Sequence, residues 1–158
     1  MDQMLELFRG QAPLAVEDAK RELRACNAYT AQFGLQLSEA EIGELVQCRS
    51  EALQNAGRIE FGGGILPKLI YAFCDSPYLE PETYETTLAE LQEAFYAYKS
   101  DAMDLYTDDE LIDLMVSVFN GRARGSAEYL IGTSLDALCR YARSGFDESG
   151  ADEAGDLF

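Results

Sequence analysis

One apolar stretch decides the fold: Ile65-Leu66-Pro67-Lys68-Leu69-Ile70-Tyr71-Ala72-Phe73-Cys74. As a helix it presents apolar side chains on nearly every face, and a helix of that kind belongs in the interior of a protein. The glycines at residues 62–64, directly before it, break the chain and separate this helix from what precedes it. We therefore expect a short helix at the centre of the fold, with the other elements packed around it.

The sequence on the N-terminal side of this stretch predicts two helices. Apolar residues recur at steps of three and four from Pro13 until Gly34, and proline is favoured in the first turn of a helix. A second helix is expected between Ser38 and Gly57. It begins with a capping box, Ser38-Glu39-Ala40-Glu41, in which the serine and the second glutamate each satisfy a backbone N–H group.

The sequence on the C-terminal side predicts three more helices. The longest opens at Pro81 and carries an apolar stripe formed by Tyr84, Leu88, Leu91, Phe95 and Tyr98. A capping box from Thr107 to Glu110 begins the next helix, whose wide apolar face places it at the centre together with the stretch at residues 65–74. Ser126 caps the last helix, which is expected to run to Gly145.

These segments predict an all-α protein. No part of the chain shows the alternation of a strand, and no repeat of fixed period is present. We expect a single irregular bundle of about six helices in one domain, residues 1–145. Residues 146–158 are rich in acidic and small residues and are expected to form a disordered tail.

The charge of the chain is strongly negative. There are 29 acidic and 12 basic residues and no histidine, for a net charge of −17. Twelve of the acidic residues, against the single base Lys99, fall between Leu69 and Gly121. A surface of this kind repels nucleic acid and anionic lipid and attracts basic molecules. We expect a basic protein partner, with no direct contact to nucleic acid or membrane.

The composition lacks several of the residue types and patterns that enzymes commonly use for catalysis and metal binding. Without histidine the commonest proton shuttle and metal ligand is missing. The four cysteines are widely spaced, form no Cys-x-x-Cys pair, and are expected to be small core residues: Cys26, Cys48, Cys74 and Cys139. We expect no metal and no cofactor, and the composition favours a protein without enzymatic activity while leaving catalysis open.

The sequence predicts a cytoplasmic location. The first residues lack the basic flank and the apolar run of a secretion signal, and no apolar stretch reaches the roughly 20 residues that span a bilayer.

A loop with two arginines is the best candidate for a ligand site. Residues 120–126 read Asn-Gly-Arg-Ala-Arg-Gly-Ser and lie directly before a predicted helix N-terminus, where free N–H groups and the helix dipole favour an anion. The candidate anion-binding residues are Arg122, Arg124, Gly125 and Ser126. The alternative is a solvated loop whose arginines pair with nearby carboxylates.

Two further features of the predicted helices leave alternatives open. Ala89, Tyr96 and Met103 form a thin second stripe on the fourth helix, which either contacts a neighbouring helix or provides an interface, for example in a homodimer rather than a monomer. Arg49 falls on the apolar face of the second helix. Its head either reaches solvent or a glutamate, or it is a buried charge that orients a ligand carboxylate.

Two runs of sequence resemble a small uncharacterised family of all-helical proteins from anaerobic gut-type bacteria. They are Phe61-Gly62-Gly63-Gly64-Ile65-Leu66-Pro67-Lys68-Leu69 and Phe119-Asn120-Gly121-Arg122-Ala123-Arg124-Gly125-Ser126-Ala127-Glu128-Tyr129-Leu130. The resemblance covers most of the chain apart from the acidic tail. It implies a bacterial protein of the cytoplasm and carries no functional residue, because the family has no assigned activity.

Two functional hypotheses follow from these patterns. The first is a non-enzymatic acidic helical module whose surface binds a basic region of another protein. The second is a protein that binds a small anion or a phosphorylated metabolite through the loop of Arg122 and Arg124, and that could be an enzyme of unfamiliar type.

Overall fold

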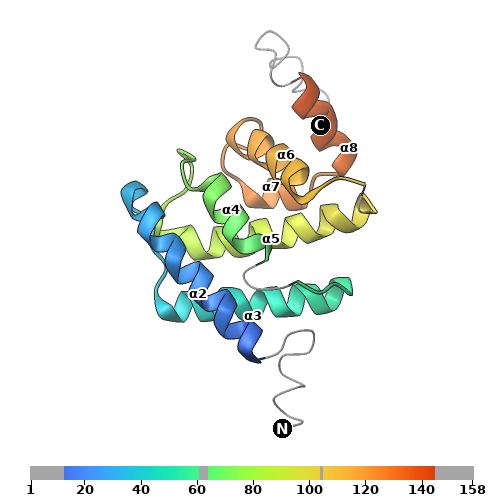
Figure 1. The fold of residues 1–158 in the computed structure, drawn as a ribbon. Coiled ribbons are helices and arrows are strands. Elements are labelled where there is room, and N and C mark those ends of the chain that lie inside the picture. Colours follow the sequence, from blue (N-terminus) through green and yellow to red (C-terminus); the bar gives the residue numbers. More distant parts are fainter. Residues whose placement is uncertain (1–12, 61–63, 104, 145–158) are drawn as a thin grey trace.

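The computed structural model describes residues 13–60, 64–103 and 105–144, and the predicted acidic tail lies outside them. All regular elements in this part of the chain are helices, which confirms the all-α prediction (Figure 1). The α-helices are α2 (Pro13–Thr30), α3 (Glu39–Ala56), α4 (Ile65–Phe73), α5 (Tyr84–Asp101), α6 (Asp108–Asn120), α7 (Ala127–Ile131) and α8 (Leu135–Ser144). Short 3₁₀ turns at Ala31–Phe33 and Pro81–Thr83 flank α2 and α5.

Both capping boxes form as predicted. The Ser38 hydroxyl accepts a hydrogen bond from the Glu41 N–H at 3.1 Å, and the Glu41 carboxylate accepts one from the Ser38 N–H at 2.8 Å. Thr107 and Glu110 make the same reciprocal pair at the start of α6. The glycine predicted to end α3, Gly57, adopts a φ of 68°, a left-handed conformation that glycine reaches without steric cost.

The last predicted helix is divided into α7 and α8, so that part of the prediction is wrong. Gly132 ends α7 and Ser134 begins α8, where its hydroxyl accepts from the Ala137 N–H at 3.2 Å. The hydroxyl of Tyr98 lies within hydrogen-bonding reach of the carbonyl oxygens of Leu130 and Thr133. Carbonyls at the break are therefore satisfied from α5, and the chain can turn there.

The core consists of two clusters that meet at α4. One face of α4, with Ile65, Leu69 and Phe73, joins a cluster with α6, α7, α8 and most of α5. The adjacent face, with Leu66 and Ile70, joins a cluster with α2, α3 and the first turns of α5. The central pair is thus α4 and α5, whereas α6, which the sequence places at the centre, lies within one cluster. Two positions of α4 remain exposed to solvent, against the expectation of burial on every face: Lys68 and Tyr71.

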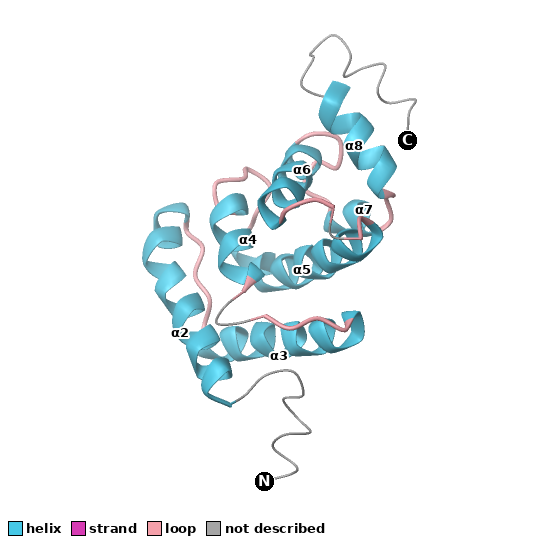
Figure 2. Ribbon diagram, turned by 45° about the vertical axis from the view of Figure 1, so that its right-hand side comes forward, coloured by secondary structure: helices cyan, strands magenta, loops and turns pink. Residues whose placement is uncertain are grey.

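Helix α5 crosses the middle of the molecule, and α3 lies alongside it in both ribbon views (Figures 1 and 2). Helices α4 and α6 pack on the other side of α5, and α2 packs against α3 and α4. The side-by-side packing of α3 and α5 brings acidic residues of both helices to a shared surface.

Candidate functional site

The arginine loop is folded back on the end of α6 rather than open toward a ligand. The N–H groups of Ala123 and Gly125 donate to the carbonyls of Val118 and Phe119 at 2.8 and 2.7 Å. Those of Arg124 and Ser126 donate within the loop itself, at 3.2 and 3.1 Å. Four backbone donors that could have converged on an anion are therefore already used.

The side chains of the loop are also accounted for. The Arg122 guanidinium lies 5.6 Å from the centre of the Tyr141 ring, a cation–π contact. The Ser126 hydroxyl accepts from the Tyr129 N–H at 3.1 Å and so caps α7, which has five residues. Gly125, at φ 84°, faces Tyr78 at a distance that leaves no room for a Cβ. Of the four candidate residues, Arg124 alone presents an exposed side chain, so the structure does not assemble the predicted anion site.

The predicted interface stripe is wrong as a surface. Tyr96 is 4% exposed and lies in the core, Ala89 is half-buried, and Met103 is exposed beyond the end of α5. The alternative prediction, that the stripe contacts neighbouring elements, is confirmed for Tyr96. The stripe therefore gives no support to a homodimer.

Tyr96 belongs to a buried polar cluster with Arg49 and Glu60. Its hydroxyl donates to Glu60 Oε1 at 2.7 Å, and the Nε of Arg49, a fully buried side chain, lies 3.2 Å from the same oxygen. The Ile65 N–H at the start of α4 donates to this oxygen at 3.3 Å. Burial and the neighbouring Glu60 carboxylate raise the pKa of Tyr96 far above its usual range. Pairing of Arg49 with a glutamate is confirmed, whereas exposure of its head to solvent is wrong.

The strongest candidate for a site is a groove between α3 and α5. It has two adjoining hollows of about 310 and 470 Å³, which share Cys48 and Glu51 in their linings. The charged residues that line both hollows are all acidic: Glu44 and Glu51 from α3, and Glu85, Glu90 and Glu93 from α5. We call this groove the acidic groove.

The carboxylates of the acidic groove repel one another. Burial raises the pKa of Glu85 above its ordinary value of 4.5, and the charge and hydrogen bond of Glu44 raise it further. Burial also raises the pKa of Glu90, with smaller contributions from Glu128 and Glu93. Neighbouring carboxylates disfavour the ionised form of one another because their charges repel. The groove is therefore a place where a positive charge would be stabilised.

The same charges affect Cys48, which contradicts the expectation of four core cysteines. Cys26 and Cys74 are buried as expected, but Cys48 is exposed in the acidic groove and Cys139 is half-buried. Partial burial and the carboxylates of Glu51, Glu85 and Glu44 raise the pKa of the Cys48 thiol. It is held protonated at neutral pH and is a poor nucleophile.

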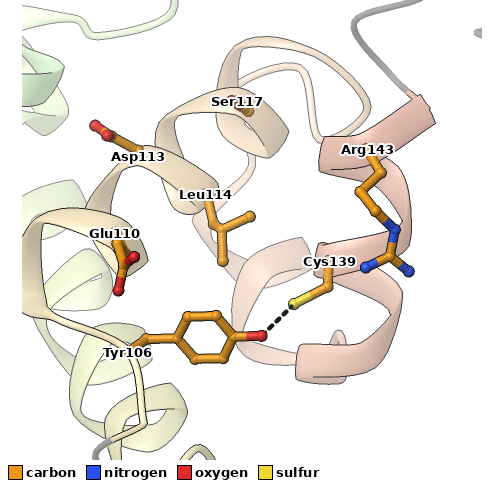
Figure 3. A pocket seen from close by; sticks show the side chains of 7 residues that line it. All are labelled: Tyr106, Glu110, Asp113, Leu114, Ser117, Cys139 and Arg143. Carbon is orange, nitrogen blue, oxygen red and sulfur yellow. Dashed lines mark hydrogen bonds between the residues drawn. The ribbon is translucent and has the colours of Figure 1, made fainter.

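A third hollow, of about 360 Å³, lies between α6 and α8 (Figure 3). Tyr106 and Leu114 line its apolar part, and the Tyr106 hydroxyl is 3.7 Å from the Cys139 sulfur. This contact with the thiol raises the pKa of Tyr106. Glu110, also at its edge, is held in the capping box of α6. None of the residues that line it has a buried side-chain polar atom without a partner.

A comparison with protein families places the chain. A model for a family of unknown function (DUF6323) matches residues 22–148, the larger part of the sequence. The chain belongs to this family. The match agrees with the resemblance to an uncharacterised family, and it includes every residue of the acidic groove. Among curated proteins and among solved structures, no match was found. Membership of the family therefore assigns no activity to any residue.

Two features are absent from the residues that the structure describes. They contain no group of three or more side chains that could hold a metal ion. None of their helices is both long and apolar enough to cross a membrane.

Sequence reasoning missed the contribution of α3 to the acidic surface. It counted charge along the chain, where Glu44 and Glu51 lie outside the acidic segment between Leu69 and Gly121. Their spacing of seven residues places both on one helix face, opposite the apolar positions of α3, and this signal was available. Conversely, Asp108 and Asp109 of the acidic segment pair with Lys99 and Lys68 at 2.9 and 3.1 Å.

Proposed function

We propose that the protein is a non-enzymatic interaction module whose acidic groove binds a basic segment of a partner protein. One observation carries the proposal: two adjoining hollows between α3 and α5 have a charged lining made of glutamates and no base. Complementary charge of this kind steers association and selects partners.

The electrostatics of the groove support a cationic partner over a neutral one. A bound Lys or Arg side chain would lie among carboxylates that now repel one another, such as Glu44 and Glu85. Part of the binding free energy would therefore come from relief of repulsion in the free protein. An anion would be repelled by the carboxylates of the acidic groove. The loop that contains Arg122 and Arg124 offers an anion no free N–H group at residues 123–126 either, because these N–H groups already donate to carbonyls.

The setting that goes with this proposal is the bacterial cytoplasm. The bacterial origin is supported by the resemblance given by residues 61–69 and 119–130. The cytoplasm is supported by four cysteines that form no disulfide with one another in the structure.

The test is a calorimetric titration with a capped tetra-lysine peptide at low salt. The parent protein should bind it, and the affinity should fall as salt rises. The combined variant Glu51→Gln, Glu85→Gln, Glu90→Gln should bind about tenfold more weakly, since each charge contributes a modest share. The matched control changes three exposed carboxylates that line neither hollow: Asp75→Asn, Asp101→Asn and Asp136→Asn. Equal weakening in both variants would mean that net charge alone attracts the peptide and would overturn the proposal.

A further inference from the structure

The hollow of about 360 Å³ between α6 and α8 has an apolar floor and one positive charge at its side (Figure 3). Leu114 of α6 and the ring of Tyr106 form the floor, and Cys139 faces them from α8. Among the described residues of the lining, Arg143 alone is basic. The volume lies at the lower end of the roughly 300–1,000 Å³ typical of ligand pockets. Such a hollow suits one large apolar side chain that is accompanied by a carboxylate.

The charges around the hollow favour a carboxylate on one side. Arg143 is exposed, and its guanidinium lies on the α8 wall beside Cys139 (Figure 3). The α6 wall carries Glu110 and Asp113, and the Asp113 side chain is turned away from the hollow (Figure 3). A carboxylate that enters is therefore attracted toward α8 and repelled from α6.

A segment with this chemistry follows α8 directly. Residues 145–158 lie outside the described structure and contain five acidic side chains, two phenylalanines and no base. Within them, Asp156-Leu157-Phe158 puts a carboxylate two residues before an aromatic ring. The intervening residues 145–155 can span about 35 Å when extended, whereas α8 is about 15 Å long. Residues 156–158 can therefore reach any part of the hollow.

We propose that residues 156–158 of the same chain occupy this hollow. The Phe158 ring lies on Leu114, and the Asp156 carboxylate pairs with Arg143 on the α8 side. Burial of the aromatic side chain is the driving force, and the ion pair fixes the direction in which the segment enters. Residues 156–158 are then ordered, in contrast to the disordered tail expected from composition, and the residues before them form the tether. This interaction is independent of the acidic groove.

Phe146 is the other aromatic residue of this segment, and its position is less suitable. It follows the end of α8 by two residues, whereas a reverse turn takes four. The chain therefore has no room to turn back over Cys139 before Phe146 is reached. Phe158 follows a tether of eleven residues, 145–155, that contains Gly150 and Gly155 and can make this turn. The two phenylalanines thus provide a matched pair of positions for substitution.

The test measures the rate at which iodoacetamide modifies Cys139, followed by mass spectrometry, with the exposed Cys48 as the internal reference. Phe158 covers Cys139 when it is docked, so Phe158→Ser should raise the rate at Cys139 about fivefold, since the entropy of closing the tether offsets most of the burial of one side chain. Phe146→Ser makes the same change in the same segment and should leave the rate unchanged. Asp156→Asn should raise the rate about twofold, because an exposed ion pair contributes little.

Two results would overturn the proposal: an unchanged rate at Cys139 in Phe158→Ser, or an equal increase in Phe146→Ser. In the parent the rate should not depend on protein concentration, because the covering segment belongs to the same chain. A rate that rises on dilution would show that a second copy fills the hollow, and it would also overturn the proposal. The circular dichroism of both variants should match that of the parent, since both substitutions lie beyond the end of α8.

Discussion

Removal of the Tyr96 hydroxyl tests the buried cluster that joins α3, α4 and α5. In Tyr96→Phe the carboxylate of Glu60 loses a donor at 2.7 Å, in a site where Tyr96 is 4% exposed and water cannot easily replace it. A hydrogen bond to a charged group contributes about 1.5–3 kcal/mol to the free energy of unfolding. For a domain of this size that loss lowers the melting temperature by about 3–12 °C.

The measurement is urea unfolding followed by circular dichroism at pH 7, with Tyr78→Phe as the control. Tyr78 is 40% exposed, so loss of its hydroxyl should change stability by no more than about 0.5 kcal/mol. Glu60→Gln should cost more, about 3–5 kcal/mol, because it removes a counter-ion of the fully buried Arg49. Equal stability of Tyr96→Phe and Tyr78→Phe would refute the assignment of Tyr96 to this cluster.

Three further predictions concern the groove, the arginine loop and the cysteines. The pKa of Glu85 is raised from 4.5 in the folded protein, so its ionised carboxylate lowers stability as pH rises above about 4.5. The variant Glu85→Gln should therefore have a higher melting temperature than the parent at pH 7 and the same melting temperature below pH 4.5. A lower melting temperature of the variant at pH 7 would contradict this. Millimolar phosphate should shift the melting temperatures of the parent and of Arg124→Ala alike, because the loop N–H groups are already used, and a larger shift in the parent would restore the anion site. In the folded protein iodoacetamide should modify Cys48 while the buried Cys26 and Cys74 stay protected. The rate of modification at Cys48 should be slow at neutral pH and should rise with pH, because the pKa of its thiol is raised. Modification of Cys26 before Cys48 would show that Cys26 is not buried.

Local signals were sufficient to place most of the helices. The capping boxes at Ser38 and Thr107 and the stop at Gly57 act through neighbours in the sequence, so their geometry could be predicted without knowledge of the fold. The break between α7 and α8 could not, because part of its support comes from Tyr98, more than 30 residues away. A prediction from neighbouring residues can use Gly132 and Ser134, but it cannot include the Tyr98 hydroxyl that stabilises the turn between them.

The candidate site depended even more on contacts distant in sequence. The prediction for the arginine loop assumed free N–H groups, but these donate to carbonyls at the end of α6 or within the loop itself. The prediction for Tyr96 assumed a second exposed stripe, but Glu60, from a loop 36 residues earlier, satisfies its hydroxyl in the core. The acidic groove exists because α3 and α5 pack side by side, which no count of charge along the chain could show.

The most direct test of the central claim is an amide chemical-shift titration of the isotope-labelled protein with capped tetra-arginine at low salt. Binding in the acidic groove predicts that the largest shift changes fall on residues 44–55 of α3 and 85–93 of α5, and that they fade as salt rises. The exposed carboxylates elsewhere, among them Asp75 and Asp136, should report little change. Shift changes spread evenly over all acidic surfaces, or concentrated near Arg124, would contradict the account.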